Sequence, residues 1–318
     1  MTLPPSGPLR SGRRVVAVVV SYNRAELLRE CLAGVTAQTR PADAVVVVDN
    51  ASTDGSADLV ASEFPKADLV RLTTNTGGAG GFAAGMAQAL DRHGADLVWV
   101  MDDDTVPSTT TLEALLAAEQ DYPDDLQLVA SRVTWTDGRD QDRNIPRPVI
   151  LARARRRHAA ALAGGRPMRT ACFVSLLVTA DAIRRHGLPT ADFFIWNDDF
   201  EFTARILRRS PGIYLPRATV VHKTRELGTR TADPGDRFYY EVRNKVWTFR
   251  DGAAFGFPEV LLRVAIAVVN WARFFAHSGD REVLRTALVR GLRDGLRARP
   301  RPNREVLREA GYELGAAW

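Results

Sequence analysis

Three consecutive aspartates, Asp102, Asp103 and Asp104, follow an apolar run in the segment LVWVMDDDTVP, residues 97 to 107. Adjacent carboxylates repel one another and resist leaving water, so a buried strand that ends on three of them needs a compensating partner. Residues two apart on a strand point to the same side, which would bring Asp102 and Asp104 together and turn Asp103 away. Such oxygen ligands suit Mg²⁺ or Mn²⁺. The alternative is a solvated acidic turn.

A second acidic cluster, Asp198, Asp199 and Glu201, lies in the segment WNDDFEF, residues 196 to 202. A placed carboxylate can act as a general base that takes the proton from an attacking hydroxyl. The alternative is structural, because acids in the first turn of a helix interact favourably with the helix dipole. The structural alternative leaves Trp196 unexplained, since the flat face of its ring suits a sugar.

Apolar runs alternate with helical patterns over the first 120 residues. The β-branched runs at residues 15–20 and 44–48 predict strands buried on both faces, and residues 67–73 and 96–101 predict two more. Helical spacing follows each run, which predicts a parallel α/β sheet. Because ligands of such sheets bind beyond the carboxyl ends of the strands, the polar segments SYNR, DNASTDG, NTGGAGG and DDDT should line one site.

Individual residues in these polar segments have two interpretations each. Asp49 could accept hydrogen bonds from a uracil N–H or a ribose hydroxyl, or it could cap the next helix. Arg24 could contact a pyrophosphate or lie exposed on a helix. The pattern Gly78-x-Gly80-x-x-Ala83 matches the dinucleotide fingerprint. It follows the third predicted strand and not the first, so we expect these glycines to let backbone N–H groups approach a sugar or phosphate. A flexible loop is the alternative.

The second half of the chain is less regular. The arginine-rich run at residues 153–157 predicts an exposed basic loop or helix, and residues 169–187 predict a strand and a helix. Residues 212–224 predict a strand that leads to His222. From about residue 236 the chain is predicted to be helical.

Four motifs occur in the order found in family 2 glycosyltransferases, and the chain resembles this family over roughly residues 14 to 225. VVVSYNR is similar to its nucleotide-binding turn, VVVVDNASTDGS to its uridine-contacting acid, DDD to its metal and diphosphate motif, and WNDDFEF to its acceptor motif. The resemblance implies a GT-A fold, which is a Rossmann-like, mostly parallel α/β sheet flanked by helices. The expected organisation is a flexible N-terminus at 1–13, a GT-A domain at 14–235 and a helical, basic region at 236–318.

The resemblance also implies roles for individual residues. Asp199 would be the catalytic base, and Asp102, Asp104 and His222 would hold Mn²⁺ or Mg²⁺. An imidazole ligand favours Mn²⁺. The residues implied in binding the UDP-sugar donor are Ser21, Asn23, Arg24, Asp49, Asn75, Gly77, Gly78, Asp103 and Arg225. The residues implied in binding the acceptor are Trp196, Asp198 and Glu201.

Within the family, the glycine-rich segment, the acid motifs and the VVH segment most resemble galactofuranosyltransferases of actinobacterial cell-wall galactan. This resemblance and the chain length imply transfer of the first galactofuranose residues from UDP-galactofuranose to a rhamnosyl-GlcNAc-diphosphate-polyprenol. The alternative is a rhamnosyltransferase that uses dTDP-rhamnose, because such enzymes share much of the pattern. The expected mechanism is a single displacement with inversion at the anomeric carbon.

Composition limits the compartment and the partners. The net charge is +5 and the pI about 9.5, which favours anionic partners. Two cysteines fit a reducing compartment and no disulfide framework. The sequence shows no signal-peptide pattern and no uninterrupted apolar run of membrane-spanning length. The expected location is cytoplasmic, at the inner face of the plasma membrane.

The apolar segment at 257–279 is interrupted by Arg263, Asn270 and Arg273 and is followed by an arginine-rich tail. This pattern predicts a helix that lies on an anionic membrane surface, where a polyprenyl-linked acceptor would be found. The alternative is a core helix followed by a solvated or oligomer-forming tail.

Three other classes are less well matched by the sequence. A nucleotidyltransferase would carry a glycine-rich, basic signature near its first strand, which SYNRAELL lacks. A non-catalytic sugar-nucleotide-binding module needs neither Asp199 nor the full set of acids. Nucleic-acid binding is not expected, because the arginines are not interleaved with stacking aromatic residues.

Overall fold

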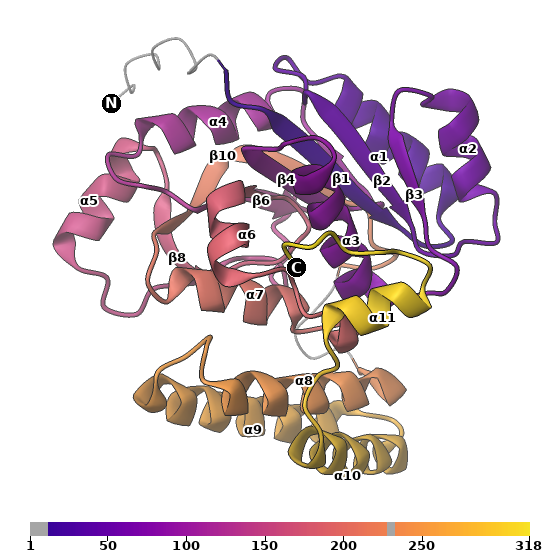
Figure 1. Ribbon diagram of the computed structural model, residues 1–318. Helices are drawn as coiled ribbons and strands as arrows, with labels where there is room; N and C mark the ends of the chain where they lie inside the picture. Colours follow the sequence, from indigo (N-terminus) through magenta and orange to yellow (C-terminus); the bar gives the residue numbers. More distant parts are fainter. Residues whose placement is uncertain (1–11, 228–232) are drawn as a thin grey trace.

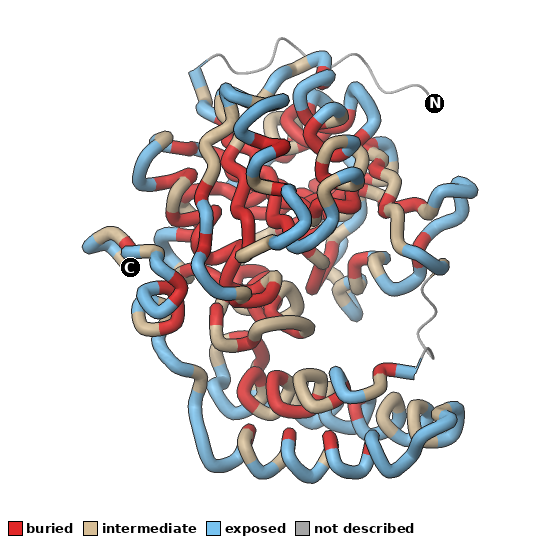
Figure 2. The backbone as a smooth tube through the Cα atoms, turned by 90° about the vertical axis from the view of Figure 1, so that its right-hand side faces the viewer, coloured by how far each residue is buried: buried red, intermediate tan, exposed pale blue. Residues whose placement is uncertain are grey.

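A computed structural model describes residues 12–227 and 233–318 (Figure 1). A ten-stranded sheet with helices on both faces forms the larger part of the molecule, and a layer of three helices lies below it. Buried residues concentrate in the sheet and the helices against it, whereas the outer side of the helical layer is mostly exposed (Figure 2). The flexible N-terminus expected at 1–13 lies almost entirely outside the described residues.

The parallel strands predicted in the first half of the chain form one side of the sheet. Along this path the strand order is β3-β2-β1-β4-β9-β6-β10-β8-β7, and β5 pairs with β10. The strands with a common direction are β1 (Val15–Ser21), β2 (Ala44–Asp49), β3 (Asp68–Arg71), β4 (Leu97–Asp102), β6 (Leu128–Thr134) and β10 (Gly212–His222). In register, Ser21 pairs with Asp49 and Val20 with Asp102, so the carboxyl ends of β1, β2 and β4 meet.

The remaining strands make the sheet mixed. Strand β9 (Leu176–Thr179) lies between β4 and β6 and is antiparallel to both, because it enters the sheet from the loosely patterned middle of the chain. The short strands β5 (Thr105–Pro107) and β8 (Arg166–Thr170) pair antiparallel with β10, and β7 (Arg147–Pro148) pairs with β8. The part of the sheet that carries the first polar segments, from β3 to β4, is therefore parallel.

Helices cover both faces of the sheet. They are α1 (Ala25–Thr36), α2 (Ser56–Glu63), α3 (Gly77–Asp91), α4 (Thr111–Asp121), α5 (Ala154–Leu162), α6 (Ala180–His186) and α7 (Asp198–Leu207). The basic run at 153–157 is part of α5. Helix α3 begins within the glycine-rich segment, where Gly81 and Gly85 lie against Val20 and Val18 so closely that a Cβ would be 2.4 Å from either side chain. These glycines therefore allow α3 to pack on β1.

Four helices follow the short 3-10 turn η2 (Gly235–Arg237). They are α8 (Phe238–Asp251), α9 (Phe257–His277), α10 (Arg281–Arg297) and α11 (Asn303–Glu309). Helices α8, α9 and α10 form the separate layer, whereas α11 returns to the sheet domain (Figure 1). There, Thr73 N donates to Ala310 O over 2.9 Å. The helical tail was expected from the sequence, but its return to the sheet domain was not.

Candidate functional site

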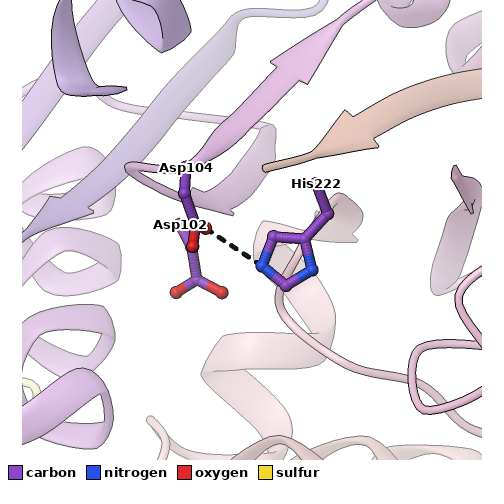
Figure 3. A group of neighbouring side chains, drawn as sticks. All are labelled: Asp102, Asp104 and His222. Atoms are coloured by element: carbon purple, nitrogen blue, oxygen red, sulfur yellow. Dashed lines mark ion pairs between the residues drawn. The ribbon is translucent and has the colours of Figure 1, made fainter. Parts of the chain in front are cut away.

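The two outer aspartates of the triple acid and His222 meet at the ends of β4 and β10. One ligand atom from each of Asp102, Asp104 and His222 lies within 4.8 Å of the other two (Figure 3). His222 Nε2 is 3.0 Å from Asp104 Oδ1. Strand β5 follows the triple acid and pairs with β10, where Thr105 is opposite His222. This pairing brings together two sequence segments that are more than a hundred residues apart.

The ring of His222 is oriented by side chains that sequence reasoning did not identify. Its Nδ1 is 2.9 Å from Gln141 Oε1 and 3.2 Å from Asn144 Oδ1. Gln141 Nε2 donates to His222 O and to Thr224 Oγ1, which leaves Gln141 Oε1 as an acceptor. His222 Nδ1–H is therefore the donor, and the lone pair of Nε2 is directed at the aspartates in the neutral ring. Partners of this kind fix the tautomer of metal-binding histidines.

Asp103 points away from this group, toward the first helix. Its Oδ2 accepts a hydrogen bond from Tyr22 N over 3.0 Å, and its Oδ1 lies 3.2 Å from an Arg24 nitrogen. The same Arg24 nitrogen is 2.6 Å from Asp104 Oδ2. Arg24 therefore connects the start of α1 to the triple acid and stays half-exposed, where it could also reach an anion.

The acids at this site are short of positive charge. Burial raises the pKa of Asp102 to about 7, and the Asp104 carboxylate adds to that shift while His222 opposes it. Burial raises the pKa of Asp103 to about 6, against the opposing effect of Arg24. Burial also works to raise the pKa of Asp104, but His222 and Arg24 outweigh it and lower this pKa below its usual value. A bound cation would favour the charged form of all three carboxylates.

Unpartnered polar atoms gather at the same strand ends. Three buried side-chain oxygens there make no hydrogen bond within residues 12–227 and 233–318: Ser21 Oγ, Asp49 Oδ1 and Thr105 Oγ1. Among the same residues, Asp104 Oδ1 has His222 Nε2 as its one close partner. Buried polar atoms are almost always satisfied, so these oxygens mark where an ion or ligand would make contacts. Two carboxylates and one imidazole form a donor set that fits Mn²⁺ better than Mg²⁺.

The polar segments after β1, β2 and β3 brace one another. Asn23, with φ +52°, accepts from Thr53 N through its Oδ1 over 2.7 Å. Asp49 Oδ2 accepts from Ser52 N over 3.2 Å, so Asp49 takes part in turn formation and keeps its Oδ1 free. Sequence reasoning missed Asn50, which donates to Gly77 O and accepts from Thr76 N, both over 2.8 Å. Asn50 thus holds the glycine-rich loop beside β2.

The glycine-rich loop has one position that only glycine can occupy. Gly77 has φ +67°, and a Cβ there would lie 2.0 Å from Phe194 O. Gly78 follows it at the start of α3, with open space around its Cα. Asn75 Oδ1 accepts from Gly77 N over 2.8 Å, so this oxygen stabilises the loop and the Asn75 amide nitrogen remains for a ligand. Because Gly77 approaches Phe194 so closely, the glycine-rich loop packs directly against the segment that precedes α7.

The segment before α7 has an unusual backbone conformation. Phe194, Trp196 and Asn197 all have φ +65°, which is costly for residues with side chains. The buried amide of Asn244 on α8 supports this turn by donating to Phe193 O, Ile195 O and Trp196 O over 2.8–3.0 Å. Helix α7 starts immediately afterward. Asn244, which no sequence signal indicated, therefore determines how Asp198 and Asp199 are presented.

The two aspartates of α7 differ in their protonation. Burial raises the pKa of Asp198 well above its usual value, and the carboxylates of Asp199 and Asp102 raise it further. Burial also raises the pKa of Asp199, to about 6, while the Phe200 N–H and the ammonium of Lys245 oppose the shift. At neutral pH Asp199 is therefore mostly a carboxylate, whereas burial favours the protonated form of Asp198. The carboxylate of Asp102 is among the charges that raise the pKa of Asp198, so the two acidic clusters interact electrostatically.

Lys245 joins Asp199 to the helical layer. Its Nζ donates to Asn197 Oδ1 over 2.7 Å and lies 3.1 Å from Glu241 Oε1. Glu241 in turn accepts from Asn197 Nδ2 over 2.9 Å and from the indole N–H of Trp271 on α9 over 3.3 Å. The first turn of α7 is thus held by charged groups of α8.

Three other predicted site residues have different surroundings. Glu201 was expected to bind the acceptor, but both of its oxygens pair with Arg205, over 2.7 and 3.0 Å, and the pair lines a cavity on another side of α7. The role of Glu201 in acceptor binding stays a prediction, and in this structure its carboxylate is held by Arg205. Trp196 is half-buried in the turn before α7. Arg225 is exposed after β10 and makes no polar contact with the described part of the chain.

Comparisons with known proteins agree with this fold. A family model for glycosyl transferase family 2 matches residues 16–182. The galactofuranosyltransferase GlfT1 of Mycolicibacterium smegmatis is 32% identical over 200 residues, which are 61% of this chain and 65% of that protein, slightly under two thirds of its length.

Two solved structures are similar in fold. Staphylococcus aureus TarS 1-349 in complex with UDP-GlcNAc has a TM-score of 0.59 at 16% identity, with 92% of this chain and 84% of that chain covered. The mannosyltransferase PcManGT from Pyrobaculum calidifontis, in complex with GDP-Man and Mn²⁺, has a TM-score of 0.52 at 21% identity and covers 96% of this chain and 83% of its own. The mixed sheet flanked by helices is the expected GT-A fold with a helical C-terminal region. Because the family model spans more than half of its length, the chain belongs to glycosyl transferase family 2.

Proposed function

We propose that the protein is an inverting, metal-dependent galactofuranosyltransferase. Its donor would be UDP-galactofuranose and its acceptor a rhamnosyl-GlcNAc-diphosphate-polyprenol. The sequence similarity to GlfT1 supports the donor sugar. The observation that carries the proposal is the convergence of Asp102, Asp104 and His222, and Asp199 adds a carboxyl whose pKa of about 6 suits a base at neutral pH.

In the proposed reaction Asp199 accepts the proton of an acceptor hydroxyl as the oxygen of that hydroxyl forms its bond to the anomeric carbon. Asp198, whose protonated form is favoured by burial, would donate a hydrogen bond that orients the acceptor or Asp199. The bond to UDP breaks on the opposite face of the sugar, so the anomeric configuration inverts. A divalent cation held by Asp102, Asp104 and His222 would stabilise the negative charge that develops on the departing diphosphate. Arg24 and Arg225 would add positive charge around the donor diphosphate.

One assay tests the proposed activity. Purified protein with Mn²⁺ and a synthetic rhamnosyl acceptor is given a panel of UDP- and dTDP-sugars, and the products are read by mass spectrometry and NMR. We expect transfer from UDP-galactofuranose with inverted anomeric configuration. Transfer from dTDP-rhamnose alone would refute the donor assignment, and a product that keeps the donor's configuration would refute the mechanism.

The charge of Lys245 should set the lower pH limit of this activity. Protonated Asp199 cannot accept a proton, so kcat/KM should rise with pH and reach half of its maximum near pH 6. Lys245→Met removes a charge that favours the Asp199 carboxylate, so the pKa of Asp199 should rise and the acidic limb should move up by about one pH unit. The measurement is the pH profile of kcat/KM.

Lys245→Arg is the matched control because it keeps the charge. Its acidic limb should stay near that of the unsubstituted protein even if the maximal rate falls. Since Lys245 also bonds Asn197, a loss of packing alone would lower the maximal rate of both variants without moving the limb. An unmoved limb in Lys245→Met would therefore contradict the electrostatic role.

The membrane-facing part of the proposal concerns α9. By length and composition this helix could cross a membrane. This was not predicted from the sequence, because charged residues interrupt the apolar run. Trp271, Phe274 and Phe275 of α9 pack around Phe238 of α8. Exposed apolar residues cover the rest of the helix: Phe257, Leu261, Leu262, Val264, Ile266, Val268 and Val269.

We infer that α9 lies along an anionic membrane surface at the cytoplasmic side. Its packing on α8 and α10 keeps it in a layer with charged helices, which disfavours insertion across the bilayer. Exposed arginines on α10 complement anionic headgroups: Arg281, Arg285, Arg290, Arg293 and Arg297. In this proposal residues 14–235 carry the transfer chemistry and residues 236–318 bring it to the lipid-linked acceptor.

Substituting the exposed face of α9 tests the docking. Leu261→Glu/Val268→Glu replaces two side chains that are 57% and 54% exposed, so the fold should be retained. We expect flotation with phosphatidylglycerol-containing vesicles to weaken by about tenfold or more, because apolar burial in the interface is lost and negative charge is added. Ile150→Glu/Leu151→Glu is the matched control, with exposed apolar residues outside α9. Equal flotation of both variants and the parent would contradict the docking surface.

A further inference from the structure

A cavity is lined by Glu201 and Arg205 of α7 and does not include Asp198 or Asp199 in its lining. Its volume is about 930 Å³, within the usual range for small-molecule sites. Helices α6, α7 and α8 form its walls together with residues 299–304, the segment that leads into α11, and the C-terminal residue Trp318. Figure 1 labels α6, α7, α8 and α11 and marks the C-terminus. Of the residues predicted from sequence to bind donor, metal or acceptor, Glu201 alone is in the lining.

The lining of this cavity is strongly basic. Two carboxylates, Glu201 and Asp251, face six arginines there, which are Arg184, Arg205, Arg250, Arg299, Arg301 and Arg304. Burial lowers the pKa of His186, also in the lining, and the guanidinium of Arg205 lowers it further, so this imidazole is neutral at pH 7. The guanidinium groups are therefore the source of positive charge in the cavity.

Four of the arginines have structural partners. Arg205 pairs with Glu201 and donates to the carbonyl oxygens of His186 and Leu188. Arg250 donates to carbonyl oxygens at the end of α10, and Arg304 to carbonyl oxygens of Leu314, Gly315 and Trp318. Arg301 pairs with Asp192 and Glu309. These contacts hold the walls in place.

Arg184 and Arg299 have no such role. Neither makes a hydrogen bond or ion pair with any residue in 12–227 or 233–318, and they approach the cavity from α6 and from the segment before α11, which are far apart in sequence. Asp251, the remaining acid of the lining, is exposed and forms no ion pair with either of them. Two unpaired guanidinium groups on opposite segments of one basic cavity present ten N–H donors without an acceptor.

We propose that this cavity binds a phosphate-bearing anion, which Arg184 and Arg299 hold from two sides. The forked guanidinium group matches phosphate oxygens in pairs, and a cavity of this size accommodates a diphosphate group with substituents. The bound anion would link the segment before α11 to α6. Because α11 also packs on α3 beside the glycine-rich loop, occupancy would stabilise the attachment of the C-terminal segment to the sheet domain.

Calorimetry with inorganic pyrophosphate on the metal-free full chain tests the site. Without a divalent cation the donor site holds pyrophosphate weakly, so the result does not depend on the transferase proposal. We expect saturable binding that raises Tm and weakens as salt increases. In Arg184→Gln/Arg299→Gln the Kd should increase by about tenfold or more, because two charge-assisted contacts are lost. Arg166→Gln/Arg217→Gln is the matched control: both arginines are exposed, lack partners among the described residues and lie outside the cavity.

A parallel arm with phosphatidylglycerol vesicles distinguishes the source of the phosphate. If pyrophosphate binding depends on Arg184 and Arg299, the ligand class is a soluble phosphorylated anion. If pyrophosphate does not bind but vesicle binding depends on these two arginines and not on Arg166 and Arg217, the site takes a lipid phosphate. If neither arm distinguishes the two double variants, the site is refuted. The result of the galactofuranosyltransferase assay does not depend on that outcome.

Discussion

Replacing Asp199 with asparagine should lower kcat by about 10²- to 10⁴-fold, the usual contribution of a positioned general base. Asparagine keeps the size of the side chain but cannot accept the acceptor proton. Because Asp199 lies on α7 and not among the donor-side segments, UDP binding should stay within about threefold of the parent value. Single-turnover transfer rates and calorimetric UDP titrations measure the two quantities.

The neighbouring residue supplies the control for Asp199→Asn. Burial raises the pKa of Asp198 well above its usual value, which favours the uncharged form, and asparagine reproduces the hydrogen-bond donor of that form. Asp198→Asn should therefore lower kcat by less than about tenfold. The opposite result, an inactive Asp198→Asn and an active Asp199→Asn, would contradict the assignment. Asp198 would then be the base.

Removing divalent cations should lower turnover by about 10²- to 10³-fold or more, because the charge on departing UDP loses its main stabilisation. Dialysis against a chelator followed by Mn²⁺ should restore it. His222→Ala should weaken Mn²⁺ binding, measured directly by electron paramagnetic resonance, so the result does not depend on activity alone. Gln141→Ala should weaken it by about 10- to 100-fold, because Gln141 only orients the His222 ring.

The relative size of these effects on Mn²⁺ affinity tests the roles of the individual residues. A ligand should matter more than the residue that orients it, and Gln38→Ala, which removes a buried amide that bonds Gly34 O and Ser108 O, should leave Mn²⁺ affinity unchanged. Full turnover in the presence of chelator would contradict the metal role of Asp102, Asp104 and His222. Equal Mn²⁺ affinity in His222→Ala and the parent would remove His222 from the site.

The strand ends were predictable from local pattern alone. β-branched runs such as VVAVVV form buried strands, and the polar residue after each run marks the carboxyl end. Parallel strands with helical connections then place Ser21, Asp49 and Asp102 at one edge in register. Asp102 and Asp104 converge and Asp103 turns away, as predicted, but the two-residue period of a strand is not the cause. Strand β4 ends at Asp102, and Asp103 and Asp104 form the turn into β5.

Other features depended on contacts between distant segments. The Gln141 and Asn244 side chains have no sequence signature, because one amide among many becomes important only when the fold brings it to His222 or to the turn before α7. Glu201 was assigned to the acceptor site from its motif, but the motif does not specify which side of a helix faces which cavity. The pairing of Glu201 with Arg205 decided that.

The sequence by itself determined the order of strands and helices, the acids at the strand ends and the amphipathic character of α9, because these depend on residue periodicity and on neighbours in the chain. Only the tertiary structure decided that His222 meets the triple acid, that Lys245 and Asn244 hold the start of α7, and that residues 299–304 close a basic cavity against α6. The physical reason is that pKa values, side-chain orientation and cavities arise from burial and from charges close in space. Such neighbours can be a hundred residues apart, and local sequence carries no record of them.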